Sequence, residues 1–113
     1  MKFIVKILLY AIAVLATGYL LPGVSVASFT VALILALVLS LLNVTLKPIL
    51  VILTIPVTLF TLGLFLLVIN AVIILVADYF VTGFSVAGFL WALLFSIVLS
   101  IINAILNGIF NSN

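Results

Sequence analysis

Two stripes of polar side chains recur at helical spacing in an otherwise apolar sequence. The stripe near the C-terminus consists of Ser96, Ser100, Asn103 and Asn107. An earlier stripe consists of Ser40, Asn43 and Lys47. Separations of three and four residues place the members of each stripe on one face of a helix. Such groups predict either the polar lining of a pore or pathway, or hydrogen bonds between packed helices.

Two further polar residues stand alone in apolar segments. Asn70 lies nearer the middle of its segment, where an amide without a partner is costly, so we expect it to face another helix or another subunit. Asp78 is the only acidic residue and is either an ion or proton site or an interfacial residue exposed to lipid headgroups. Its place in the last turn of a predicted helix favours the interfacial interpretation, which we also give to Lys47.

The residue types that enzymes use for catalysis are almost absent. The sequence has no histidine, no cysteine and a single acidic residue. It therefore lacks thiol and imidazole chemistry, the usual zinc ligands and any pair of carboxylates. It also contains neither a nucleophile–base set nor a glycine-rich phosphate loop. We expect no catalytic residue, no cofactor and no metal site, and we predict that the chain is not an enzyme.

Composition predicts the environment of the chain. Its residues are 71% hydrophobic and 4% charged, and the mean hydropathy is +1.89. Soluble domains have about 45–50% apolar and about 25% charged residues. Three lysines and one aspartate cannot cover a water-facing surface, so we predict an integral membrane protein whose first partner is the lipid bilayer. The net charge of +2 comes from too few groups to indicate nucleic-acid binding.

An internal repeat organises the chain. When the sequence is shifted by sixty positions, residues 10–47 fall on residues 70–107 without a gap, and 15 of the 38 pairs are identical. Aliphatic matches arise easily by chance, so the informative pairs are the polar, aromatic and glycine pairs. They are Tyr19/Tyr79, Gly23/Gly83, Ser25/Ser85, Phe29/Phe89, Ser40/Ser100 and Asn43/Asn103. A duplication of this kind constrains the architecture more strongly than any single motif.

These patterns predict an all-α membrane protein with four transmembrane helices, arranged as two tandem parallel hairpin repeats. A spanning helix needs roughly 20 apolar residues. The predicted spans are about Phe3–Leu21, Phe29–Leu46, Ile55–Phe80 and Phe89–Asn107. We assign one transmembrane domain to residues 1–113, with repeat 1 at about 3–47, a connector at 48–62 and repeat 2 at about 63–107. The polar tail Gly108–Asn113 is expected to fray.

The connector is too apolar for an aqueous loop, and its two prolines disfavour one continuous helix. We predict a short interfacial helix over Pro48–Leu53. Thr54 could then cap the third span, with Pro56 in its first turn, where a missing N–H costs nothing.

The repeat also predicts the topology. Each copy contains two spans, so both copies enter the bilayer from the same side and are related by a twofold axis along the membrane normal. Lys2, Lys6 and Lys47 fall at one face and Asp78 at the other, so the positive-inside rule places both termini in the cytoplasm.

The two links inside the repeats have an alternating, strand-like pattern. They are Gly23–Ser28 and Gly83–Gly88. A twofold axis makes two such strands antiparallel, so we predict a short ribbon in which Ser25–Ala27 and Ser85–Ala87 lie near the axis. Ser28 is placed to cap the second helix, whereas the equivalent Gly88 has no side chain to do so.

Several segments resemble the phage holin superfamily IV family of bacterial four-helix membrane proteins. They are Tyr19–Val26, Asn43–Leu50, Leu53–Phe65 and Ile69–Ala71. The resemblance covers essentially the whole chain and implies the four-helix fold and the bacterial cytoplasmic (inner) membrane. The family name implies a holin, which assembles into membrane lesions that release a lytic enzyme. Thr82 stands where a proline would complete the second Pro-Gly turn, and the C-terminal tail lacks the charges that holins commonly carry there.

Two functions stay open at this point. One is a holin-like homo-oligomer that permeabilises the membrane, and the other is a structural or accessory membrane protein that binds lipid or a larger membrane-protein partner. A transporter of the small multidrug-resistance type is disfavoured, because that class depends on a membrane-embedded glutamate and this chain has none.

Overall fold

The computed structural model describes residues 2–110, which form five helices and two short strands. In chain order the elements are α1 (Phe3–Leu20), β1 (Val24–Val26), α2 (Phe29–Leu53), α3 (Ile55–Phe60), α4 (Phe65–Phe80), β2 (Phe84–Val86) and α5 (Phe89–Phe110). Three helices, α1, α2 and α5, are long and apolar enough to cross a membrane, and α4 is apolar but shorter. This architecture fits a four-span membrane protein.

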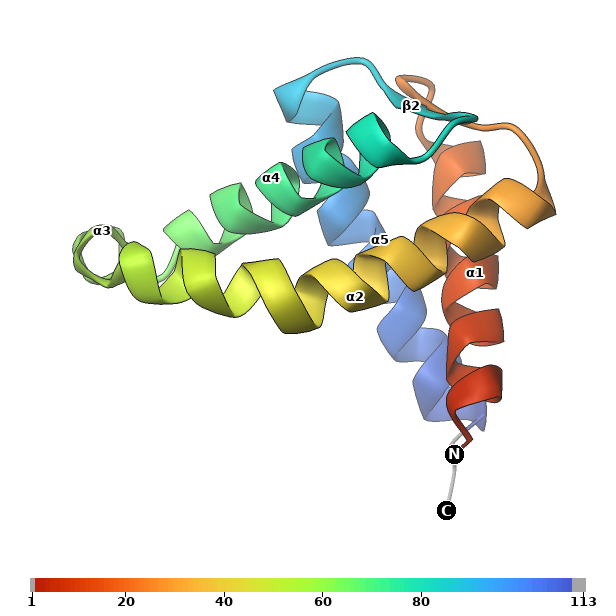
Figure 1. The fold of residues 1–113 in the computed structure, drawn as a ribbon, viewed down its shortest axis with the longest axis horizontal. Helices are drawn as coiled ribbons and strands as arrows, with labels where there is room; N and C mark the ends of the chain where they lie inside the picture. The colour runs from red at the N-terminus through yellow and green to blue at the C-terminus, as the bar shows by residue number, and fades with distance from the viewer. Residues whose placement is uncertain (1, 111–113) are drawn as a thin grey trace.

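The helices form two pairs that cross steeply (Figure 1). Helix α1 lies beside α5, and α2 lies beside α4, while the most extensive packing joins the two pairs, between α4 and α5 and between α1 and α2. The strands lie at the corner where the pairs meet, the start of α1 and the end of α5 lie at the free end of the α1/α5 pair, and α3 lies at the free end of the α2/α4 pair (Figure 1). The molecule is therefore a wedge whose two arms diverge from the corner that carries the strands.

The strands pair as an antiparallel ribbon, which confirms the prediction for the two links. Ser25 is the partner of Ser85 at the centre of the register. Beyond the strands, the N–H of Ala27 donates to the Gly83 carbonyl at 3.0 Å, and the N–H of Ala87 donates to the Gly23 carbonyl at 2.9 Å. The two links thus make matching contacts at an offset of sixty residues.

Glycine is required beside the ribbon at two matching positions. A Cβ at Gly23 would lie 2.2 Å from the Trp91 ring, and a Cβ at Gly83 would lie 2.8 Å from Val31. Gly83 also has φ +94°, which favours glycine. Val31 and Trp91 are themselves sixty residues apart, so each glycine packs against the same position of the other copy's helix.

The core sits near the corner of the wedge and is built from small and large apolar side chains. Alanines with no exposed surface line the packed faces of the helices: Ala11, Ala13, Ala32, Ala36, Ala71, Ala77 and Ala92. Small residues let helix backbones approach closely in membranes. Phe95, Leu35, Leu39 and Val14 fill the remaining space. Large apolar side chains also cover much of the outer surface, as lipid contact requires.

The boundary predicted for the second span is wrong. It was placed at Leu46 with a separate helix over Pro48–Leu53, but α2 is continuous to Leu53 and contains Pro48. Proline removes one backbone hydrogen bond. A full break would leave more backbone groups unpaired beside lipid, so continuing the helix costs less.

The third span is also interrupted, although one helix over Ile55–Phe80 was predicted. Leu62 (φ 56°) and Gly63 (φ 90°) break it between α3 and α4. The Thr61 hydroxyl bridges the break, because it accepts the Phe65 N–H at 3.1 Å and donates to the Thr58 carbonyl at 3.2 Å. The short helix of the connector is therefore α3 rather than residues 48–53.

The expected helix caps have mixed outcomes. Ser28 accepts the Val31 N–H at 3.2 Å and caps α2 as predicted. Pro56 lies in the first turn of α3 as predicted, but the Thr54 hydroxyl donates back to Leu50 at 2.7 Å and caps nothing. Helix α5 continues past Asn107 to Phe110, so the first part of the expected frayed tail is helical, and residues 111–113 lie outside the described residues.

Candidate functional site

Both polar stripes and Asn70 face one polar cleft between the arms of the wedge. The cleft consists of two adjoining cavities with volumes of about 640 Å³ and about 90 Å³. Tyr10, Asn43, Leu99 and Ser100 line both cavities, so the two lie side by side. Only Asp78, of all the residues singled out in the sequence, lies away from it. The stripes thus meet within one chain instead of facing outward on separate helices.

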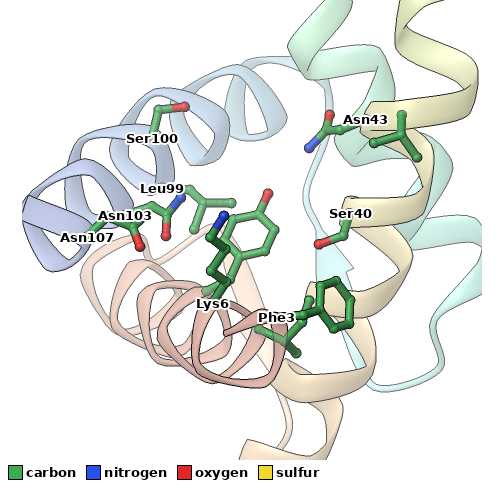
Figure 2. Close-up of a pocket in the computed structure, with 11 residues that line it drawn as sticks. Phe3, Lys6, Ser40, Asn43, Leu99, Ser100, Asn103 and Asn107 are labelled. Atoms are coloured by element: carbon green, nitrogen blue, oxygen red, sulfur yellow. The ribbon is translucent and has the colours of Figure 1, made fainter. Parts of the chain in front are cut away.

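The larger cavity lies between α1, α2 and α5. Its polar lining consists of Lys6, Tyr10, Ser40, Asn43, Ser100, Asn103 and Asn107. Figure 2 shows the Lys6 side chain pointing into the cavity beside Asn103, with Asn43 and Ser40 on the opposite wall. Lys6, Asn43 and Ser100 are exposed, so the cavity has an open mouth at the divergent ends of the helices.

The smaller cavity extends the cleft to α4. It adds Asn70, Lys47 and Ser96 to the polar lining. Asn70 therefore faces other helices of its own chain, which is one of the two environments expected for it. Tyr10 and Asn70 occupy equivalent repeat positions, and both line this cavity.

The serines of the stripes satisfy their hydroxyl donors within their own helices. Ser40 donates to the Ala36 carbonyl, Ser96 to the Leu93 carbonyl and Ser100 to the Ser96 carbonyl, each at 2.8 Å. Only their acceptor lone pairs face the cleft.

The asparagines offer hydrogen-bonding groups that the chain does not use. The side-chain oxygens of Asn103 and Asn107 are buried and have no hydrogen-bond partner among the described residues. Asn43 is exposed and lines both cavities together with Tyr10. A buried acceptor without a donor is costly, and Asn103 and Asn107 both line the larger cavity, so rotation of either amide toward the cavity would bring its oxygen within reach of a ligand donor.

The cleft is closed toward the ribbon. One helical turn beyond Tyr10, Ser40 and Ser100 lie Val14, Leu35 and Phe95, which are almost or entirely buried. The Phe95 ring in turn packs against Phe84 of β2, with ring centroids 5.3 Å apart. The cleft is thus a dead end within a single subunit and not a channel through it.

The charges are segregated along the molecule. Lys6 and Lys47 line the cleft, and the described residues around its two cavities include no acidic side chain. Asp78 lies at the ribbon, half-buried, where its carboxylate accepts the Val86 N–H at 3.3 Å. Sequence reasoning placed Asp78 near headgroups but missed this contact, which depends on how β2 folds back beside α4.

Sequence reasoning also missed two residues of the cleft, Lys6 and Tyr10. The signal for Tyr10 was present, because the repeat aligns it with Asn70. Lys6 precedes Tyr10 by one helical turn and shares its face.

Comparison with known proteins finds two relatives that match most of the chain. The uncharacterized membrane protein YvlD of Bacillus subtilis (strain 168) is 40% identical over 95 residues, which cover 80% of each chain. The uncharacterized protein SCO3922 of Streptomyces coelicolor (strain A3(2)) is 41% identical over 103 residues, which cover 82% of each chain. No solved structure matches the fold. Residues 1–105 match the family described as mycobacterial 4 TMS phage holin, superfamily IV, and the chain therefore belongs to the phage holin superfamily IV family.

Proposed function

We propose that the chain crosses the bacterial cytoplasmic membrane four times, as two parallel hairpin repeats with both termini in the cytoplasm. The two strands begin and end sixty residues apart, and so do the two glycines and the residues that they pack against, which supports the repeat. Lys6 and Lys47 lie at the open end of the wedge, which supports a cytoplasmic mouth for the cleft.

In this orientation α3 lies in the cytoplasmic interface of the bilayer. Its end and the following turn expose large apolar side chains, of which Phe60 (92% exposed) and Leu62 (93%) are the extremes. Exposing such an apolar patch to water is unfavourable, whereas burying it at the boundary between the lipid headgroups and the acyl chains is favourable.

The function that the geometry supports best is a non-enzymatic accessory membrane protein that holds the polar part of a lipid in its cleft. The observation that carries this proposal is the dead-end polar cleft, which is lined by residues of α1, α2, α4 and α5. Its volume of about 640 Å³ falls within the range of about 300–1,000 Å³ that is usual for ligand sites. Phe3 and Val44 line the larger cavity and are largely exposed, so its mouth lies against the bilayer as well as the cytoplasm, and a lipid of the cytoplasmic leaflet can reach it.

A holin-like homo-oligomer that permeabilises the membrane is the second candidate. The unpaired side-chain oxygens of Asn103 and Asn107 favour it, because a neighbouring subunit could supply their donors. Membership of the holin superfamily IV family points the same way. A larger membrane-protein partner could fill the same role as a second copy.

Reconstitution of the full chain into dye-loaded phosphatidylcholine–phosphatidylglycerol vesicles separates the two candidates. We expect no dye release, and we expect phospholipid to remain bound after transfer to detergent. Ser40→Phe, which places a ring in the cleft, should reduce the retained lipid, whereas Leu41→Phe on the exposed face of the same helix should not. Dye release that rises steeply with protein density, without retained lipid, would support the oligomeric pore instead.

A further inference from the structure

We propose that the ligand of the cleft is the headgroup of an anionic phospholipid that also carries hydroxyl donors, such as phosphatidylglycerol. This inference rests on the lipid-binding function proposed above and names the chemistry of the lipid. It follows from three features of the cleft: its charge, its unused acceptors and its apolar rim.

The positive charge of the cleft favours an anionic ligand. Lys6 lines the outer cavity and Lys47, half-buried, lines the inner one, and no acidic side chain of the described lining balances them. An ammonium group in a membrane-embedded cleft is costly unless an opposite charge or strong acceptors lie nearby. A phosphodiester supplies both, and Lys6 and Lys47 approach it from different helices.

The unused acceptors call for a ligand that also donates hydrogen bonds. The oxygens of Asn103 and Asn107 are buried and unpartnered, and the Ser40 and Ser100 hydroxyl donors are already directed to their own backbones. A phosphodiester has no donor of its own, so a phosphate alone would leave both amide oxygens unpaired. The glycerol hydroxyls of phosphatidylglycerol lie within a few bonds of its phosphate, and they can satisfy these oxygens once the amides rotate toward the cavity.

The apolar rim leaves room for the remainder of a lipid. Phe3, Ile7 and Val44 line the larger cavity beside the polar groups, and Phe3 is 66% exposed. An acyl-glycerol backbone can lie against these side chains while its acyl chains stay in the bilayer. Zwitterionic phosphatidylcholine fits less well, because its choline adds a positive charge and no donor.

Lipid retention by the full chain tests this assignment. The protein is purified in detergent, equilibrated with defined lipid mixtures and analysed by native mass spectrometry. We expect phosphatidylglycerol to be retained in preference to phosphatidylcholine. Lys6→Gln and Lys47→Gln should each weaken that preference by about fivefold. Lys2→Gln is the matched control, because Lys2 lines neither cavity, and it should leave the preference unchanged.

The donor requirement is tested with phosphatidylmethanol, an anionic phosphodiester lipid without hydroxyl groups. We expect it to bind more weakly than phosphatidylglycerol, and Asn107→Leu should remove the difference between the two lipids. Circular dichroism of each variant verifies that it is folded. Equal binding of the two lipids by the unmodified chain would overturn the assignment of hydroxyl donors.

The remaining outcomes distinguish failure of the anionic-headgroup assignment from failure of the proposed lipid-binding function. Equal retention of phosphatidylglycerol and phosphatidylcholine would overturn the anionic headgroup but leave lipid binding intact. Retention of neither lipid, together with dye release from vesicles, would overturn both. Soluble glycerol 1-phosphate that binds as strongly as the lipid would overturn the assignment to a membrane lipid.

Discussion

At the scale of single residues, two kinds of polar side chain share the cleft and behave differently. The serine hydroxyls donate hydrogen bonds to backbone carbonyls of their own helices, so placing them in an apolar environment costs little free energy. The asparagines cannot do this, and the side-chain oxygens of Asn103 and Asn107 stay unpaired within the described chain. In the lipid-binding function that we propose, the asparagines therefore supply the hydrogen-bonding groups left for a ligand, and the serines mainly line the walls of the cleft.

This difference predicts a small effect of Asn103→Leu on stability. The substitution removes a buried acceptor that has no partner, so the free energy of unfolding should stay the same or rise by up to about 1 kcal/mol. Unfolding of the purified protein in mixed micelles, followed by circular dichroism, measures it, with Ser100→Ala as the reference for a satisfied polar group. A loss of more than about 3 kcal/mol would show that Asn103 belongs to a hydrogen-bonded network that holds the helices together.

Residue spacing predicted the stripes but could not predict which groups would be paired. Separations of three and four residues placed Ser100 and Asn103 on one face, and both do line the cleft. Whether a hydroxyl bonds its own helix or a neighbour depends on rotamers and on packing, which spacing does not determine. The Asp78 contact with Val86 likewise required knowledge of how the chain turns after α4.

At the scale of elements, the ribbon joins the two halves of the molecule. β1 and β2 pair across the corner of the wedge, and Gly23 and Gly83 let each link pack against the other copy's helix. A two-stranded ribbon is marginal in isolation, so the helices on either side must stabilise it. The ribbon and its glycines thus depend on the same packing that closes the cleft.

The register of the ribbon predicts a specific cross-link. The chain has no cysteine, and Ser25 and Ser85 are direct partners, which places their Cα atoms about 4.5–5.5 Å apart. That separation suits a disulfide. Ser25→Cys combined with Ser85→Cys should therefore oxidise readily, as measured by the shift in gel mobility on reduction. Ser28→Cys with Ser85→Cys is the control and should stay reduced, and equal cross-linking of the two pairs would contradict the register.

The elements that sequence reasoning placed well are those with local signals. The Ser28 cap, the alternating links and Pro56 in a first helical turn each follow from a few neighbouring residues. The helix boundaries near Pro48 and Gly63 were predicted wrongly, because hydropathy is uniformly high around both residues and does not indicate where a helix ends. Pro48 was expected to end a helix that continues through it, and Gly63 breaks a span that was expected to be continuous.

At the scale of the whole molecule, the arms of the wedge enclose polar groups at one end and a dense apolar core at the other. The repeat predicted which segments are equivalent, but it did not predict the steep crossing of the helix pairs (Figure 1). These helices are apolar on nearly every face, so no amphipathic stripe indicates the angle at which they pack. The cleft is a consequence of that crossing, and it was therefore visible in the sequence only as two separate stripes.

The central claim is that the cleft opens to the cytoplasm and ends inside the protein. Three variants test it with a membrane-impermeant maleimide applied to either side of the membrane: Ser100→Cys in the cleft, Val14→Cys in the core and Ser25→Cys in the ribbon. The account predicts that Ser100→Cys reacts only from the cytoplasmic side, Ser25→Cys only from the outside, and Val14→Cys from neither. Reaction of Ser100→Cys from both sides would contradict the claim, because it would show a continuous aqueous path through the wedge.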